Sequence, residues 1–172
     1  MSEISDHLEV STAAQFKALG HPLRHRLLFA LGQEAATISQ LAAALGTAKG
    51  NVAHHLGVLR DAGMVHVAET RQVRGGTEQY YRRSVRRFDF VGEGARASHA
   101  VSLQAVAAEL ETADDVPAFT VRNLRLTAEQ AAELAATLDR MVGELEDAGA
   151  GASRYGVVVS VYRPRQPSSG TK

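Results

Sequence analysis

The chain has 172 residues and contains no cysteine, and this absence excludes two kinds of site. No disulfide framework is possible, which is consistent with a cytoplasmic protein. Cysteine thiolates, the usual ligands of soft metal ions, are also missing. Since 45% of the residues are hydrophobic, we expect one good apolar core and a smaller second one instead.

Long apolar runs are missing too, and the mean hydropathy is close to zero, at -0.14. A membrane-spanning helix needs about 20 consecutive apolar residues. The first ten residues, MSEISDHLEV, include acidic side chains and no apolar segment, so we expect no signal peptide. These absences predict a cytoplasmic protein that makes no contact with a membrane.

The residue arrangements typical of enzymes are not found either. No nucleophile stands with a base at a recognisable spacing, and no glycine loop has the pattern that binds phosphate. The adjacent residues Asp114 and Asp115 lie at a break in the helical pattern, where they most simply solvate a turn. We therefore expect neither an enzyme nor a bound cofactor.

A first short helix is predicted just after Thr37, which stands where a helix N-cap belongs. Gly46 ends this helix. The apolar residues between them recur at helical spacing: Ile38, Leu41, Ala42 and Leu45.

A second helix follows at once, with Thr47 as its expected N-cap and Gly63 at its end. Val52, Leu56 and Leu59 form one apolar stripe along it. Two helices joined by so short a turn cross steeply, which exposes the outer face of the second. The pattern is typical of a helix-turn-helix.

The outer face of the second helix carries small and polar residues. They are Gly50, Ala53, His54, Gly57 and Asp61, with Lys49 and Arg60 to one side and Asn51 to the other. Such a face can approach base edges closely, where an alanine methyl contacts thymine and His54 or Asn51 forms hydrogen bonds. The alternative is that Gly50 and Gly57 only weaken an exposed helix, by about 1 kcal/mol each relative to alanine.

A basic hairpin is predicted after the second helix, with Gly75 and Gly76 in its turn. Arg71 and Arg74 lie near its tip. The return strand is followed by Arg82, Arg83, Arg86 and Arg87. Arginine side chains bind phosphate oxygens and enter narrow minor grooves of DNA. The hairpin is therefore interpreted as the wing of a winged helix-turn-helix. The alternative is a solvated edge hairpin that its charges keep from aggregating.

Together with the run ALGHPLRHRLLFAL, these segments resemble the winged helix-turn-helix of ArsR-type bacterial transcriptional repressors. The resemblance covers residues from about 11 to 88. It is carried by the entry with His21 and Pro22, the pair His55 and Leu56, the Leu-Arg-Asp-Ala-Gly sequence that ends the second helix, and the tyrosine-rich return strand.

The resemblance implies a homodimer whose two recognition helices enter successive major grooves of double-stranded DNA and block transcription until a signal weakens binding. It implies base or backbone contacts for Thr47, Lys49, Asn51, Ala53 and His54. It implies phosphate or minor-groove contacts for Arg71 and Arg74. Gly50 joins this set of expected DNA-binding residues because it lies on the same outer face.

The chain departs from many relatives in its lack of metal ligands. Thiolate capture of arsenic, cadmium or lead is excluded, and the helix expected from about Gly94 to Thr112 holds only His99. The helix expected from Ala128 to Asp147 holds no histidine. A single histidine does not make a four-coordinate site, so we expect no metal.

The other histidines have simpler structural interpretations. His54 and His55 point about 100° apart on a helix and therefore do not chelate one ion together. We interpret His55 as a packed residue that positions the second helix. His21 and His25 are four residues apart around Pro22, which favours a hydrogen-bonded helix start over a metal pair.

Apolar residues on two sides mark the helix after the wing, which predicts two partners, its own winged domain and a second subunit. One stripe holds Ala97, Val101, Ala105 and Ala108, and the other holds Leu103, Val106 and Leu110. Ahead of the motif, Phe16 and Phe29 are predicted core residues. Leu23, Leu27, Leu28 and Leu31 should pack with the helix-turn-helix.

The last third of the chain predicts a strand, a helix and a second strand. FTVRNLRL and YGVVVSVY have strand composition, and Thr127 with Gln130 forms a capping box for the helix between them. This order indicates a βαβ-like or paired-strand addition that packs on the dimer core or holds a small-molecule effector.

We therefore expect a mainly α fold with a β-wing. Its parts are a winged helix-turn-helix at residues 8–88, a helical and strand region for dimerisation and effector binding at 89–163, and a disordered tail at 164–172.

Net charge is zero, but the charges are unevenly distributed. Through Phe88, 11 Lys or Arg stand against 7 Asp or Glu, a net charge of +4, and from Asp89 onward 8 stand against 12, a net charge of −4. The basic half contains the helix-turn-helix, as expected if that half faces DNA phosphates. We expect a sequence-specific transcriptional regulator that binds a palindromic operator as a homodimer and represses transcription.

Two alternatives stay open. One is a winged-helix module that binds another protein and never contacts DNA. The other is a derepressor that responds to a ligand or to a metal held without thiolates. The operator, the regulated genes, the inducing signal and the choice between repressor and activator do not follow from the sequence.

Overall fold

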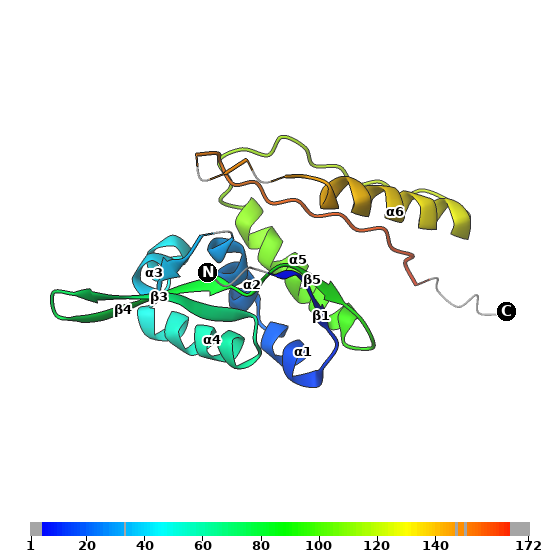
Figure 1. The fold of residues 1–172 in the computed structure, drawn as a ribbon. Coiled ribbons are helices and arrows are strands. Elements are labelled where there is room, and N and C mark those ends of the chain that lie inside the picture. Colours follow the sequence, from blue (N-terminus) through cyan, green and yellow to red (C-terminus); the bar gives the residue numbers. More distant parts are fainter. Residues whose placement is uncertain (1–4, 33, 147, 150, 166–172) are drawn as a thin grey trace. The chain divides into compact units, whose positions relative to one another are not determined.

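A computed structural model describes residues 5–32, 34–146, 148–149 and 151–165 (Figure 1). Contacts divide the chain into two compact units, Met1–Pro117 and Ala118–Lys172. In chain order the elements are β1 (Ser5–Val10), α1 (Ala13–Leu19), α2 (Pro22–Leu31), β2 (Ala36–Thr37), α3 (Ile38–Leu45), α4 (Lys49–Asp61), β3 (Val65–Val73), β4 (Gly76–Arg83), β5 (Val85–Phe90), α5 (Ala95–Leu110) and α6 (Ala128–Gly143).

The predicted winged helix-turn-helix is confirmed. α3 and α4 are separated by three residues, and β3 and β4 form an antiparallel hairpin that projects beyond the helices (Figure 1). β2 pairs with β4 on the side opposite β3 and so ties the hairpin to the start of α3. At the tip, Gly75 and Gly76 have φ angles of 108° and 153°, which residues with a Cβ rarely adopt.

Both predicted ends of α3 are confirmed, whereas the predicted start of α4 is wrong by one residue. Thr37 and Gln40 form a reciprocal capping box, and Gly46 ends α3 in the left-handed conformation. α4 has Ala48 as its N-cap, without a side-chain cap. Thr47 lies in the turn that ends α3, where its N–H donates to the carbonyl of Ala42 over 3.0 Å. Its hydroxyl oxygen accepts from the side-chain amide of Asn51 and caps no backbone N–H of α4.

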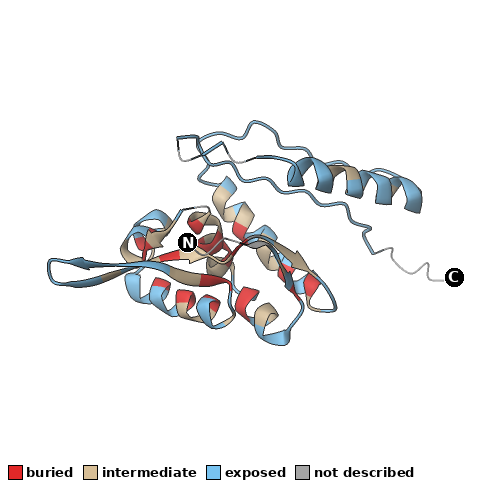
Figure 2. Ribbon diagram, in the orientation of Figure 1, coloured by how far each residue is buried: buried red, intermediate tan, exposed pale blue. Residues whose placement is uncertain are grey.

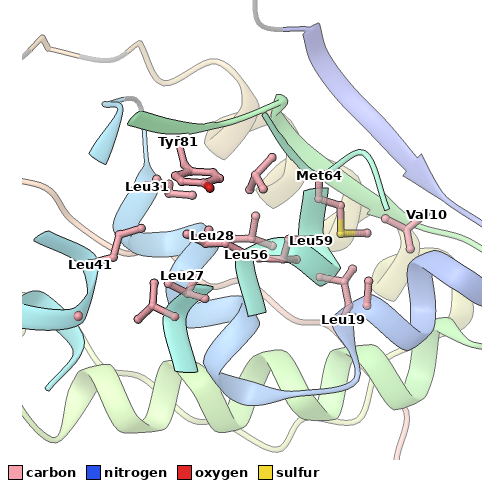
Figure 3. Close-up of a cluster of buried hydrophobic side chains, with 14 residues drawn as sticks. Val10, Leu19, Leu27, Leu28, Leu31, Leu41, Leu56, Leu59, Met64 and Tyr81 are labelled. Carbon is pink, nitrogen blue, oxygen red and sulfur yellow. The ribbon is translucent and has the colours of Figure 1, made fainter. Parts of the chain in front are cut away.

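The main core lies in the first unit, between α1 to α4 and the base of the hairpin (Figure 3). Its fully buried side chains include Leu19, Leu27, Leu31, Leu41, Leu56, Leu59, Met64, Val10, Val52 and Val65. Phe16 is only partly buried against this cluster. Phe29 is also half-buried and lies beside His25, so these two aromatic residues border the core and do not fill it.

Two strands were not expected from the sequence. β1 pairs in parallel with β5, with Leu8 opposite Phe88 and Val10 opposite Phe90. Val10 thereby becomes a fully buried core residue. The pairing brings the beginning of the first unit against the segment that follows the wing.

The helix after the wing belongs to the first unit, which runs past the expected boundary at residue 88 to Pro117. α5 packs on α2 and α1, which explains why the unit includes it. Its buried stripe is Ala95, Ser98 and Ala105, whereas Ala97 is exposed against expectation. Leu103 and Leu110 on the other predicted stripe are exposed.

The second unit has its predicted helix but not its predicted strands. α6 starts with the expected capping box between Thr127 and Gln130. Residues 119–126 and 155–162 have no strand assignment, because no other strand pairs with either segment in the described structure. No described residue from 118 to 165 is buried (Figure 2). The expected disordered tail lies outside the described residues from 166 onward.

None of the helices among the described residues is both long and apolar enough to cross a membrane.

Candidate nucleic-acid interface

The structure places the expected DNA-binding residues on two neighbouring surfaces, the outer face of α4 and the hairpin tip. Five residues of α4 are exposed together: Lys49, Gly50, Asn51, Ala53 and His54. Thr47 is half-buried beside them, and the Asn51 amide donates to its hydroxyl oxygen over 3.1 Å. The opposite face of α4 is held in the core by Val52, Leu56 and Leu59, so the exposed face has a fixed orientation.

The two glycines of α4 are not required by the packing of this chain. A Cβ atom added at Gly50 or at Gly57 would meet no atom within 4 Å, and neither residue has a positive φ angle. Alanine at these positions would favour the helix by about 1 kcal/mol each. The fold therefore does not require glycine at positions 50 and 57. Close approach of a binding partner to the helix backbone would require it.

Arg24 of α2 connects the end of α1 to the inner face of α4. Its guanidinium donates to the carbonyls of Ala18 and Lys17, the latter over 2.9 Å, and lies 3.1 Å from Nδ1 of His55. A guanidinium has no acceptor, so Nδ1 of His55 accepts this hydrogen bond. His55 is then neutral, with its proton on Nε2. This arrangement fixes α4 against α1 and α2.

His55 is buried, as predicted for a residue that positions the second helix. Burial lowers the pKa of His55, and the neighbouring His21, Arg24 and His54 lower it further. The rings of His21 and His55 lie 4.5 Å apart, and those of His54 and His55 lie 5.1 Å apart. The exposed ring of His54 therefore packs on the ring of the buried His55, which in turn contacts His21.

His21 begins α2 as a hydrogen-bonded N-cap, which confirms its predicted structural role. Its Nδ1 accepts the N–H of Leu23 over 3.1 Å, and Pro22 follows at the first helical position. No group of three or more potential metal-ligating side chains occurs within the described parts of the chain.

The two arginines at the hairpin tip differ in their ion pairing. Arg71 forms a bidentate ion pair with Glu69, at 2.7 and 2.8 Å, and lies over the ring of Tyr80. This pairing raises the pKa of Arg71 and lowers the pKa of Glu69. Arg74 occupies the exposed turn next to Gly75 and has no ion pair with any described residue. Arg74 is therefore available to an anion at once, whereas Arg71 must first leave Glu69.

The arginines that follow the return strand lie away from the tip. Arg83 is half-buried over the ring of Phe88, and burial lowers its pKa. Arg87 pairs with Asp89 at 2.5 Å. Arg82 is half-buried, and the side chain of Arg86 lies outside the described part. The cations presented beside α4 are thus mainly those of the tip.

Two contributors to this surface were missed in the sequence. Arg24 belongs to the His-Pro-Leu-Arg run that carried the family resemblance, but nothing local to that run indicates contact with His55, 31 residues away. Glu69 could have been found, because residues two apart on a strand share one face.

Comparisons with known proteins agree with a helix-turn-helix. A helix-turn-helix domain model matches residues 19–68, which include α2, α3 and α4. A search of curated proteins gave no match.

Three solved structures are similar to parts of the chain. The transcriptional repressor BigR from Xylella fastidiosa is 28% identical, over 54% of this chain and 81% of its own, with a TM-score of 0.33. A possible transcriptional regulatory protein (fragment 1–100) from Mycobacterium bovis is 27% identical, over 54% and 85%, with a TM-score of 0.34. A point mutant of MepR from a multidrug-resistant S. aureus clinical isolate is 16% identical, over 73% and 78%, with a TM-score of 0.29. The domain match and the observed fold together identify residues 19–68 as a helix-turn-helix domain within a winged unit.

Proposed function

We propose that the protein is a sequence-specific DNA-binding transcriptional regulator of the ArsR type. In this proposal α4 lies in the major groove, the hairpin tip contacts the flanking backbone or minor groove, and the protein represses transcription from a palindromic operator as a cytoplasmic homodimer. The domain match to a helix-turn-helix supports the DNA-binding role.

The observation that carries the proposal is the exposed face of α4. It combines two glycines that the fold does not require with Asn51 and His54, which can hydrogen-bond to base edges. The clamp formed by Arg24 and His55 supports this face from behind. Arg74 adds a cation beside it that is not neutralised by a carboxylate among the described residues.

The homodimer is supported by the exposed apolar side chains of α5, Leu103 and Leu110, on the stripe opposite its contact with α2. A two-fold dimer would place the two α4 helices in half-sites whose centres lie about 10 base pairs apart or a multiple of that spacing.

The experiment is a binding titration of the full chain on DNA from upstream of its own coding region, followed by footprinting. We expect protection of an inverted repeat and weaker binding to a scrambled duplex of equal length. Asn51→Ala and His54→Ala should relax preference at one or two bases, at a cost of about 1–3 kcal/mol on the cognate site. Equal affinity of every variant for both duplexes would reject the proposal and favour the protein-interaction alternative.

A further inference from the structure

The C-terminal unit exposes apolar side chains along its whole length. Its large exposed apolar residues are Phe119, Val121, Leu124, Leu126, Leu134, Met141, Val142, Leu145, Tyr155, Val157, Val158, Val159, Val161 and Tyr162. No described residue of the unit is buried. A unit without a core gains little hydrophobic stabilisation to offset the entropy of ordering its chain. The unit therefore requires another surface to cover it.

The segment 155–162 has the composition of a strand that is buried on both faces. Tyr155, Val157, Val159 and Val161 alternate on one face, and Val158 and Tyr162 lie on the other. The run is interrupted only by Gly156 and Ser160. Nearly continuous apolar runs are typical of interior strands, and they promote aggregation when left as exposed edges. Pro164 follows directly and limits how far a strand could continue.

The unit does not supply the missing strand partner itself. Residues 118–127 and 153–165 run in the same direction, and α6 runs back between them along the chain (Figure 1). This order is that of a strand, helix and strand crossover, but the two extended segments form no strand ladder with each other in the described structure. Segments 119–126 and 155–162 therefore have no strand partner in the described structure, and a strand from outside the unit can supply one.

The charges of the unit are compatible with a second copy of the same unit as the source of those strands. The charged side chains of the extended segments are all positive: Arg122, Arg125, Arg154, Arg163 and Arg165. α6 and the residues directly after it carry Glu129, Glu133, Asp139, Glu144 and Glu146 against the single cation Arg140. Strands of one copy and the helix of another are thus complementary, and the signs on the unit nearly cancel, so two copies do not repel.

The exposed apolar area is sufficient for a dimer. A stable interface buries about 800 Å² per partner. Phe119, Tyr155 and Tyr162 are 72%, 64% and 72% exposed, and an aromatic side chain buries about 150–250 Å² when covered. The valines of segment 155–162 and the apolar side of α6 add the remainder.

We propose that the C-terminal units of two copies of this chain form one shared β-sheet, in which segment 155–162 is an interior strand and α6 covers the sheet. This pairing goes beyond the proposed DNA binding, which would survive its failure. It makes the unit a folding-on-association module that holds two winged domains together.

The first test is hydrogen exchange of the full chain at micromolar and at low nanomolar concentration, with sedimentation under the same conditions. We expect slow exchange at residues 155–162 in the dimer and fast exchange once dilution gives monomers. Protection that persists in monomers would mean that the chain's own first unit covers the segment, which would overturn the proposal. Fast exchange at residues 155–162 in a stable dimer would overturn the proposal as well, because the dimer would then form through α5 alone.

The second test is the double variant Val157→Lys with Val159→Lys. Two charges placed in a shared sheet should weaken dimerisation by at least about 100-fold, because each would lose its water. Val116→Lys is the matched control, since Val116 is 44% exposed, like Val159, but lies outside the C-terminal unit. Unchanged dimerisation of the double variant would contradict the proposal. A double variant that dissociates but still binds an isolated half-site would separate this inference from the proposed function.

Discussion

The hydroxyl of Ser102 on α5 lies 3.2 Å from Nδ1 of His25 on α2. On the other side of the ring, Nε2 of His25 donates to the carbonyl of Leu19 over 2.8 Å. The imidazole therefore connects the end of α1, α2 and α5 in one buried link. Because Nε2 carries the proton of the neutral ring, Nδ1 is an acceptor. The single hydrogen of the Ser102 hydroxyl, which donates to the carbonyl of Ser98 over 3.0 Å, is therefore shared between that carbonyl and Nδ1.

Removing the hydroxyl should destabilise the first unit. Ser102→Ala leaves Nδ1 of the buried His25 without its donor, and we expect a loss of about 1–3 kcal/mol in the free energy of unfolding. Urea unfolding followed by circular dichroism would measure it. Ser11→Ala, at an exposed position, is the control and should change stability by less than about 0.5 kcal/mol. Equal stability of the two variants would show that the link contributes nothing.

Acidification should destabilise the folded protein. Burial lowers the pKa of both His25 and His55 below the ordinary value of 6.5. As the pH falls through about 6.5, the unfolded chain takes up protons that the folded chain does not, so the free energy of unfolding decreases with decreasing pH. The stabilisation is complete above that range.

Urea unfolding between about pH 7.5 and pH 5 would measure this dependence, a window that avoids most carboxyl titration. His25→Asn removes one of the two groups and should flatten the curve, whatever it does to stability at neutral pH. A wild-type stability that rises on acidification would contradict the assigned protonation states.

Alanine in place of the α4 glycines should separate stability from DNA binding. Gly50→Ala and Gly57→Ala should each stabilise the helix by up to about 1 kcal/mol, because a Cβ has free space at both positions. The same methyl groups should weaken DNA binding if the helix backbone approaches the bases closely. Gly143→Ala in α6 is the matched control, since its Cβ would also meet no atom within 4 Å. Unchanged DNA affinity in both α4 variants would argue against close approach.

The hairpin variants should differ in their salt dependence. Arg74→Ala should weaken binding to all sequences and make the slope of log affinity against log salt shallower by about one unit, as for one lost phosphate contact. If Arg74 lies in a narrow minor groove, the loss should depend on the local A·T content. Glu69→Gln should have the opposite effect, because it releases Arg71 from its ion pair. A salt series on cognate and scrambled duplexes tests both variants. The same slope of log affinity against log salt for the wild type and both variants would indicate that the wing does not contact DNA.

Any side chain at Gly94 should destabilise the first unit. A Cβ added there would lie 2.5 Å from Cδ2 of the Phe16 ring, so in Gly94→Ala the Phe16 ring or the start of α5 must shift. We expect a loss of about 1–3 kcal/mol in the free energy of unfolding. Phe16→Ala removes the obstacle, and the double variant should lose less than the sum of the two single variants. Strict additivity in thermal or urea unfolding would contradict this contact.

Much of the winged unit could be predicted because its signals are local. A capping residue and its partner lie three residues apart, as Thr37 and Gln40 do, and a helix end or hairpin turn depends on a single glycine such as Gly46 or Gly75. Helical spacing likewise indicated the buried face of α4 and therefore the residues on its exposed face. The fold class and the position of the candidate DNA-binding surface follow from such short-range patterns.

Other features depend on contacts between residues far apart in sequence, which no local pattern encodes. β1 and β5 each have weak strand signals and form only because they meet, and His25 contacts Ser102 across 77 positions.

The C-terminal unit shows most clearly what local sequence patterns do not predict. Composition predicted strands at 119–126 and 155–162, and this prediction is wrong for the single chain, because a strand exists only when another strand satisfies its backbone. Sequence by itself determined which segments of this protein would be helices, turns and strand candidates. Tertiary structure alone decided which of them find a partner within one chain, because hydrogen-bond pairing and burial are properties of surfaces that meet in space.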